Sequence, residues 1–130
     1  FLDSAEKHTD RGRYSYVAAD PASFTSAEAV PPGERTPIRL PELLASALPD
    51  RHRPTIPELP PFQGGLAGLF GYGFGREFER IPPPRHDEFG VPDVGVGVYD
   101  WVVSFDHTSD RAWAVATRPD ALDRSLDALR

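Results

Sequence analysis

The sequence predicts an α+β fold, with a mostly antiparallel β-sheet and a few short helices. Two runs of strand-forming residues, 94–106 and 111–117, flank a turn signal and predict a β-hairpin. Fifteen prolines divide the chain into short blocks, because proline ends helices and interrupts sheet hydrogen bonding. With 130 residues, the chain is long enough for one domain with a real core.

The first half of the chain alternates between strand, helix and loop signals. Residues 14–19 are rich in strand formers and end at an Asp-Pro turn signal. Residues 31–37 are expected to form a loop, and residues 49–61, with five prolines, an extended linker. Between them, leucines at helical spacing predict a short helix that ends at Pro49. These leucines are Leu40, Leu43, Leu44 and Leu48.

Residues 60–80 hold six glycines among large apolar side chains. Glycine loses the most conformational entropy on folding, so a dense run indicates a geometric requirement. The spacing fits neither the dinucleotide fingerprint nor the phosphate-binding P-loop. We therefore expect a tightly packed strand over 62–70, then a short helix over 76–80, and a valine at Gly65 should overpack. The six glycines are Gly64, Gly65, Gly68, Gly71, Gly73 and Gly75.

Residues 94–106 are the clearest strand prediction. Both faces of this strand are mostly apolar, so both should be covered. Asp100 is the one acid inside the strand, and such a carboxylate is more often paired with an arginine than catalytic. Residues 120–130 predict a closing helix with its leucines on one side.

Composition excludes several classes of function. A net charge of −6 argues against binding to nucleic acid or to an anionic membrane surface. No run of 18 apolar residues occurs, so no segment is expected to span a bilayer. The lack of cysteine excludes disulfides, thiolate nucleophiles and zinc–cysteine sites, and fits a cytoplasmic location. The chain also lacks methionine and opens on Phe1-Leu2-Asp3 in what reads as mid-strand, so we expect a fragment.

Residue types alone predict no catalytic, cofactor-binding or metal-binding constellation. The four histidines lie far apart and lack the spacing of a metal site. His86-Asp87-Glu88 follows three prolines and is expected to be a solvated loop. No G-x-S-x-G nucleophile motif occurs. The histidines are His8, His52, His86 and His107.

Four blocks of the sequence carry a family resemblance. They are Phe1-Leu2-Asp3-Ser4, Gly12 to Pro21, Leu59 to Tyr72, and Val91-Pro92-Asp93 with Gly97 to Trp101 and Phe105-Asp106-His107. Together they resemble the N-terminal region of chorismate-utilising enzymes, component I of aminodeoxychorismate (para-aminobenzoate) synthase and of anthranilate synthase. The stretch after Pro21 looks shorter than in this family, which predicts that an edge strand pair is missing.

By this resemblance, residues 1–130 are an N-terminal domain or fragment of a larger two-layer enzyme, without the C-terminal chorismate-binding domain. Phe62-Gln63-Gly64-Gly65 and Tyr99-Asp100-Trp101 favour aminodeoxychorismate synthase, which makes 4-amino-4-deoxychorismate from chorismate and ammonia for folate synthesis. Anthranilate synthase component I, in tryptophan synthesis, is the alternative within the family. The alternative outside it is a stand-alone amino-acid-binding or interaction module. In each case the chain alone is expected to be inactive.

The resemblance also implies ligands and partners. The family's tryptophan pocket, which gives feedback inhibition in anthranilate synthases, maps to Ser4, with Tyr14 and Ser15 on the next strand. The open alternative is that Ser4 satisfies only a local hydrogen bond. The expected partners are a glutamine amidotransferase, which supplies ammonia, and the chain's own C-terminal domain. Magnesium is expected in that domain, and no cofactor in residues 1–130.

Overall fold

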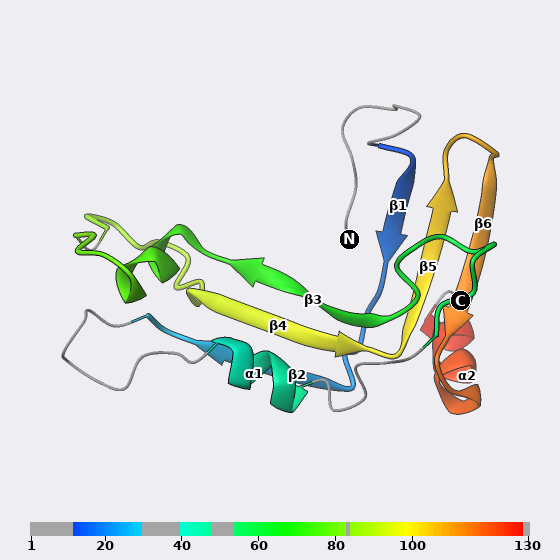
Figure 1. The fold of residues 1–130 in the computed structure, drawn as a ribbon, viewed down its shortest axis with the longest axis horizontal. Helices are drawn as coiled ribbons and strands as arrows, with labels where there is room; N and C mark the ends of the chain where they lie inside the picture. The colour runs from blue at the N-terminus through cyan, green and yellow to red at the C-terminus, as the bar shows by residue number, and fades with distance from the viewer. Residues whose placement is uncertain (1–11, 30–39, 48–53, 83, 129–130) are drawn as a thin grey trace. The chain divides into compact units, whose positions relative to one another are not determined.

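The structure, a computed structural model, describes residues 12–29, 40–47, 54–82 and 84–128. The chain divides into two compact units, a first unit of Phe1–Ala22, Asp50–Gly65 and Val98–Arg130 and a second unit of Ser23–Pro49 and Leu66–Gly97. Figure 1 shows the strands and helices in chain order. They are β1 (Tyr14–Val17), β2 (Ser23–Ala27), α1 (Leu40–Ala47), β3 (Gly65–Phe70), the 3-10 helix η1 (Tyr72–Glu77), β4 (Val94–Tyr99), β5 (Trp101–Asp106), β6 (Arg111–Ala116) and α2 (Pro119–Ala128).

The first unit contains an antiparallel sheet in the order β1-β5-β6. In β1, Tyr14 lies opposite Asp106 of β5, and in β6, Arg111 lies opposite the same residue. The turn between β5 and β6 contains Asp110, whose φ of +54° is a conformation that aspartate tolerates better than most residues. The predicted hairpin is therefore confirmed.

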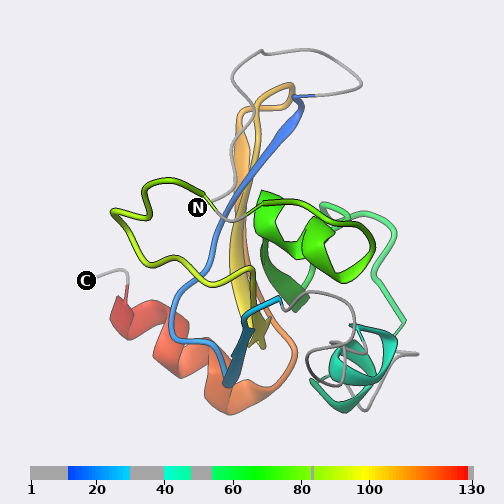
Figure 2. The ribbon, with the colours of Figure 1, turned by 90° about the vertical axis from the view of Figure 1, so that its left-hand side faces the viewer.

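Helix α2 covers one face of this sheet (Figures 1 and 2). Trp101 and Val103 of β5 pack with Ala121 of α2 in one buried cluster, with Val17 and Ala116 beside it. The intervening β5 residues, Val102 and Ser104, are buried as well. Both faces of β5 are thus covered, as its apolar sequence predicts, and the closing helix is confirmed within a residue or two of its expected bounds.

The second unit contains a sheet in the order β2-β4-β3. Figure 1 draws the central strand β4 antiparallel to both neighbours. Val94 and Val96 of β4 are buried, which gives this unit its apolar centre. The antiparallel α+β architecture expected from the sequence is therefore present in both units.

The single strand predicted over residues 94–106 is wrong, because the chain forms two strands that separate at Asp100. The carbonyl of Asp100 accepts hydrogen bonds from the backbone N–H and the hydroxyl of Thr117, at 2.8 and 3.1 Å. Its carboxylate forms an ion pair with Arg118, 3.0 Å from Oδ2 to Nη2. These bonds anchor Asp100 at the break between β4 and β5, next to the last β5–β6 pair, Trp101 with Ala116. The pairing with an arginine expected for this carboxylate is confirmed.

Strand β2 follows Pro21 at a place where no strand is expected, because its residues, Ser23 to Ala27, are mostly small or polar and give a weak strand signal. That a further edge strand pair of the family is missing after Pro21 stays a prediction. The short helix expected over 76–80 is instead the 3-10 helix η1, which begins at Tyr72. Helix α1 matches the helix predicted before Pro49, and β3 is the predicted glycine-rich strand, shorter at its start.

Asp93 connects the parts of the second unit that surround the start of β4. Its carboxylate Oδ2 accepts the backbone N–H of Ala29, at 2.9 Å, and an N–H of Arg76, at 2.8 Å. Its backbone carbonyl accepts the N–H of Gly71, at 2.7 Å. A Cβ at Gly73 would overlap the carboxylate itself, so glycine is needed where η1 passes Asp93. One buried aspartate thus fixes η1 and the end of β3 against β4.

The glycines of β3 differ in what they do. At Gly65 a Cβ would meet nothing within 4 Å, so the overpacking predicted there is wrong; this position instead needs glycine for its φ of +125°. The close approach lies three residues later. A Cβ at Gly68 would overlap the carbonyl oxygen of Gly95 and lie 2.7 Å from the Cα of Val96.

Replacement of Gly68 by alanine should therefore lower the free energy of unfolding by about 1–3 kcal/mol, because the methyl group must push β3 away from β4. Gly71→Ala is the matched control, since its φ is −68° and the nearest heavy atom would lie 3.4 Å from the new Cβ. Urea denaturation followed by circular dichroism measures both variants. Equal midpoints for the two variants would contradict the close-packing role of Gly68.

Candidate functional site

The sequence-predicted pocket residues fall partly within the first unit. Ser4 lies outside the described residues, as do His8 and His52. Tyr14 and Ser15 are neighbours on β1, next to β5. The side chains around them decide what this part of the sheet can do.

Asp106 holds the two ends of β1 and β5 together. Arg13 donates two hydrogen bonds to its carboxylate, from Nε at 3.0 Å and from Nη2 at 2.6 Å. The backbone N–H groups of Thr108 and Ser109 and the Ser109 hydroxyl donate to the same carboxylate. A buried carboxylate needs such donors, since an unpaired charge is costly to remove from water.

These donors also change the acidity of Asp106. The hydrogen bonds from Arg13 hold the pKa of the Asp106 carboxyl well below its usual range, and the donors of the β5–β6 turn act in the same direction. Desolvation opposes them but is outweighed. The Asp106–Arg13 pair therefore remains ionised at neutral pH and serves as a structural clamp.

Ser15 shares a hydrogen bond with His107. The Ser15 hydroxyl lies 2.5 Å from His107 Nε2, and the backbone N–H of His107 donates to the carbonyl of Arg13 at 2.9 Å. Ser15 is buried, whereas His107 is exposed. Among the described residues no carboxylate contacts the other ring nitrogen of His107, so the pair lacks the orienting group of a serine hydrolase. The hydrogen bond to His107 instead holds the Ser15 hydroxyl in a fixed position on its face of the sheet.

Tyr14 and Tyr16 lie on the opposite face of β1 from Ser15, because successive strand residues point to opposite faces. Their ring centroids are 6.3 Å apart, and Phe62 packs edge-on against Tyr16 at 5.6 Å. The guanidinium of Arg13 lies 4.8 Å from the centre of the Tyr14 ring. Burial raises the pKa of Tyr16. A pocket on one face of this sheet could therefore be lined by the side chain of Tyr14 or by that of Ser15, but not by both.

The two motifs that favour aminodeoxychorismate synthase lie together in the first unit. Gly64, at φ +110°, has the carbonyl oxygen of Tyr99 3.0 Å and a methyl of Thr117 2.9 Å from where its Cβ would be. Gln63 holds the preceding segment, because its amide bonds both the N–H and the carbonyl of Ile56, at 2.9 and 2.8 Å. Gly64 is therefore placed to let this segment pass close to the β4–β5 junction.

Within the described parts of the chain, no three histidine, aspartate or glutamate side chains gather to hold a metal ion. His86, Asp87 and Glu88 are exposed, and Asp87 accepts only the N–H of Gly90 in a local turn, at 3.0 Å. No helix in the described ranges is long and apolar enough to cross a bilayer.

Sequence reasoning assigned no role to Arg13, Asp106 or His107, although all three lie in the blocks that carry the family resemblance. The sequence signal that could have indicated them is a charged or polar residue at the end of an apolar strand: Arg13 directly precedes β1, and Asp106 and His107 lie at the end of β5. The partners could not be matched from sequence, because Arg13 and Asp106 are 93 positions apart.

Comparison with known proteins finds relatives of two names over most of the chain. It is 36% identical over 116 residues to aminodeoxychorismate synthase component 1 of Salmonella typhimurium, a match that covers 82% of this chain and 25% of that protein. It is 34% identical over 128 residues to anthranilate synthase component 1 of Streptomyces coelicolor, covering 98% of this chain and 23% of that protein. The chain thus spans about a quarter of the length of these relatives.

The fold has a solved counterpart. The crystal structure of anthranilate synthase component I from Streptococcus pneumoniae aligns with a TM-score of 0.62 and 23% sequence identity, over 97% of this chain and 30% of that one. At this identity the likeness concerns the fold alone. No family model matches the chain.

The Asp106 clamp predicts a defined dependence of stability on pH. A carboxyl whose pKa is lowered by folding stabilises the native state above its unfolded pKa, about 3.9, and this stabilisation is lost as the pH falls further. Asp106→Asn should therefore lower the urea midpoint at pH 7, and the gap to wild type should shrink below about pH 4. Glu88→Gln removes an exposed charge and is the control. A gap that stays constant from pH 7 to about pH 2.5 would contradict the assignment.

Proposed function

Because this chain belongs to the family of aminodeoxychorismate synthase component 1 and anthranilate synthase component 1, we propose that it is the N-terminal part of an aminodeoxychorismate synthase component I. The observation that carries this choice is the pair of motifs Phe62 to Gly65 and Tyr99 to Trp101. The identity to the Salmonella typhimurium enzyme supports the family that the two enzymes share. The enzyme would form 4-amino-4-deoxychorismate from chorismate and ammonia, in the cytoplasm.

In this proposal the chain supplies structure rather than reacting groups. Three of its buried carboxylates, Asp93, Asp100 and Asp106, are engaged by arginines within their own units. Chorismate and magnesium would bind to a C-terminal domain, and a glutamine amidotransferase would deliver the ammonia.

Anthranilate synthase component I remains the second candidate. A relative of that name aligns with nearly the whole chain, whereas the Salmonella typhimurium match covers 82% of it. The two candidates differ in product, so the reaction itself separates them.

The product assay uses the longest polypeptide that the gene encodes, with chorismate, magnesium and ammonia. We expect 4-amino-4-deoxychorismate, identified by mass spectrometry, and no product from residues 1–130 alone above a blank without protein. Anthranilate as the product would replace the proposal by the second candidate. The absence of either product would favour a stand-alone binding or interaction module.

The tryptophan pocket predicted at Ser4, Tyr14 and Ser15 is part of the same proposal, with the side chain of either Tyr14 or Ser15 lining it, since the two point to opposite faces of β1. In the full-length enzyme, Ser4→Ala should weaken tryptophan binding by about tenfold or more, because a hydrogen bond to a charged group contributes about 1.5–3 kcal/mol. Calorimetric titration measures the affinity, and chorismate kinetics without tryptophan should hardly change. Ser26→Ala, an exposed serine of β2, is the control. Equal tryptophan affinities for Ser4→Ala and wild type would mean that Ser4 is structural.

A further inference from the structure

Seven large apolar side chains in the described part of the second unit are exposed to solvent, and five of them lie in or beside η1 or in the segment that leads into β4. Tyr72 is 87% exposed, Phe89 86% and Phe78 75%. A single exposed apolar residue is ordinary on a folded protein, but a group of them marks a contact surface. We name the group the aromatic surface. It consists of Phe70, Tyr72, Phe78, Phe89 and Val91.

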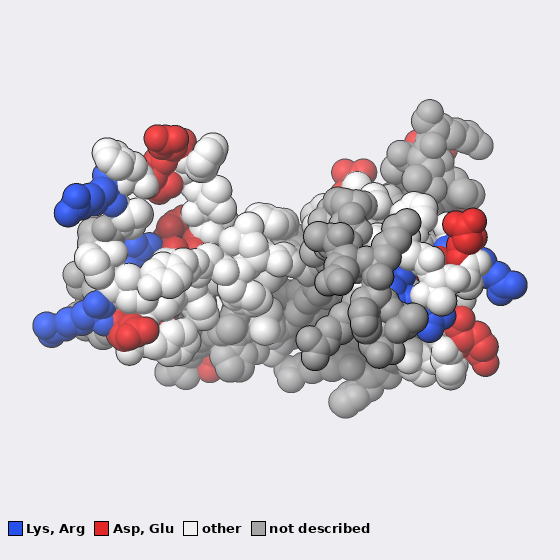
Figure 3. All heavy atoms as spheres, turned by 90° about the horizontal axis from the view of Figure 1, so that it is seen from above, with Lys and Arg blue, Asp and Glu red and all other residues white. Residues whose placement is uncertain are grey.

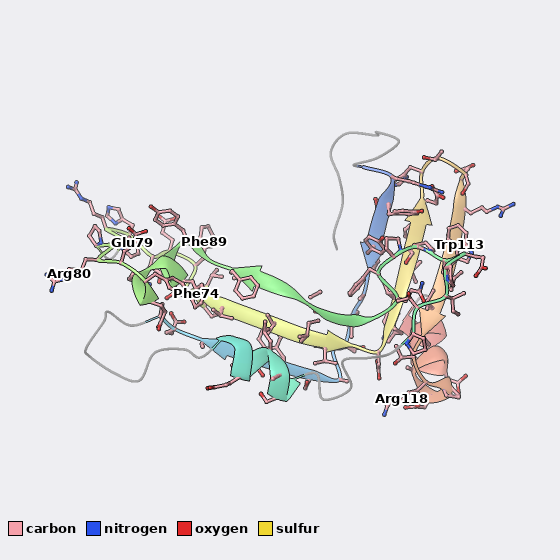
Figure 4. The ribbon with its side chains drawn as sticks, viewed as in Figure 1. Phe74, Glu79, Arg80, Phe89, Trp113 and Arg118 are labelled. Carbon is pink, nitrogen blue, oxygen red and sulfur yellow. The ribbon has the colours of Figure 1, made fainter. Side chains whose placement is uncertain are left out.

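The residues of this surface stand on one packed support. Phe74 lies between Phe70 and Phe78, with ring centroids 6.0 and 5.3 Å apart, and meets Phe78 edge-on. The segment that carries Phe89 and Val91 leads into Asp93. Asp93 accepts hydrogen bonds from Gly71 and Arg76, which lie in the segment that carries the other three residues of the surface. Figure 4 shows Phe74 and Phe89 at the same end of the second unit. The backbone segments that carry the exposed rings are therefore held in place before any partner arrives.

Charged side chains surround the aromatic surface. Figure 3 shows acidic and basic residues of both signs among uncharged atoms at this end of the second unit. Glu79 and Arg80 follow η1, and Arg85 and Glu88 precede Phe89; all four are exposed. An apolar centre with a charged rim is the usual composition of a protein interface.

We propose that the aromatic surface docks against the larger part of the polypeptide, which the relatives carry outside the matched region. The match covers 25% of the Salmonella typhimurium protein, so about three-quarters of that protein lies elsewhere. A segment on the same chain is present at high effective concentration, and so keeps an apolar surface covered at all times. A separable partner would leave these rings in water whenever it was absent, and permanent interfaces are the more hydrophobic class. The inference rests on family membership and is independent of which chorismate reaction the enzyme performs.

Thiol labelling tests this docking, because the chain contains no cysteine of its own. The variants are Tyr72→Cys and Phe89→Cys, at the two most exposed aromatic positions, and Thr108→Cys in the exposed β5–β6 turn is the control. Circular dichroism first checks that each variant keeps the wild-type denaturation midpoint. The labelling rate of each introduced thiol is then read by peptide mass spectrometry in residues 1–130 and in the longest polypeptide that the gene encodes.

In the longer polypeptide we expect Tyr72→Cys and Phe89→Cys to react at about one tenth of their rate in residues 1–130, or more slowly still, because labelling needs an accessible thiolate. Thr108→Cys should react at the same rate in both polypeptides. Equal rates at Tyr72 and Phe89 in the two polypeptides would overturn the proposal, as would a gene that ends at Arg130. Protection that appears only after a glutamine amidotransferase is added would assign the surface to that partner instead. Protection of residues 1–130 that grows with their concentration would assign it to a second copy. The product assay on the same samples separates a failure of the docking proposal from a failure of the proposed function. Protected thiols without 4-amino-4-deoxychorismate would refute the proposed function and leave the docking proposal standing.

Discussion

The structure depends on the requirement that a buried carboxylate must have a cationic or N–H donor. Three aspartates, Asp93, Asp100 and Asp106, lie at the ends of β4 and β5 and are buried. Each is paired with one arginine: Arg76, Arg118 and Arg13 respectively. The loss of one partner from a buried pair is costly because the other charge remains out of water. The three pairs therefore fix where β4 and β5 begin and end, and which neighbouring element meets each end.

These pairs explain how a Pro-rich chain with short strands holds defined junctions. Asp100 lies at the break between β4 and β5, where its carbonyl accepts the N–H of Thr117 and its carboxylate pairs with Arg118. The Gly64 backbone passes close to this same junction, where a side chain would collide with the carbonyl of Tyr99. The two motifs that favour aminodeoxychorismate synthase thus pack against each other at this junction. Their presence in this chain is explained by geometry, whichever ligand the complete enzyme binds.

The second unit combines a tight interior with an apolar exterior. Gly68 and Gly95 bring β3 and β4 close, and Val94 and Val96 are buried beside them. The rings that follow β3 point outward from this support instead of closing over it. Solvent-exposed aromatic side chains of this size are poorly compatible with a free surface, since each one forgoes the transfer free energy of burial. A covalently attached domain satisfies that requirement without the cost of bringing two molecules together.

The sequence by itself determined the elements that short-range rules control. These are the β5–β6 hairpin with its turn, the two helices bounded by prolines or leucine spacing, the α+β class, and the family, through blocks of contiguous residues. The local rules failed at β2, where small polar residues form a strand only because β4 offers an edge to pair with.

Only the tertiary structure decided the rest. It split residues 94–106 at Asp100 and moved the close approach from Gly65 to Gly68. It also supplied His107 as the partner of Ser15, 92 positions away. Charge pairing and steric contact depend on distance in space, and periodicity along the chain contains no information about which of several arginines or glycines will meet a given neighbour.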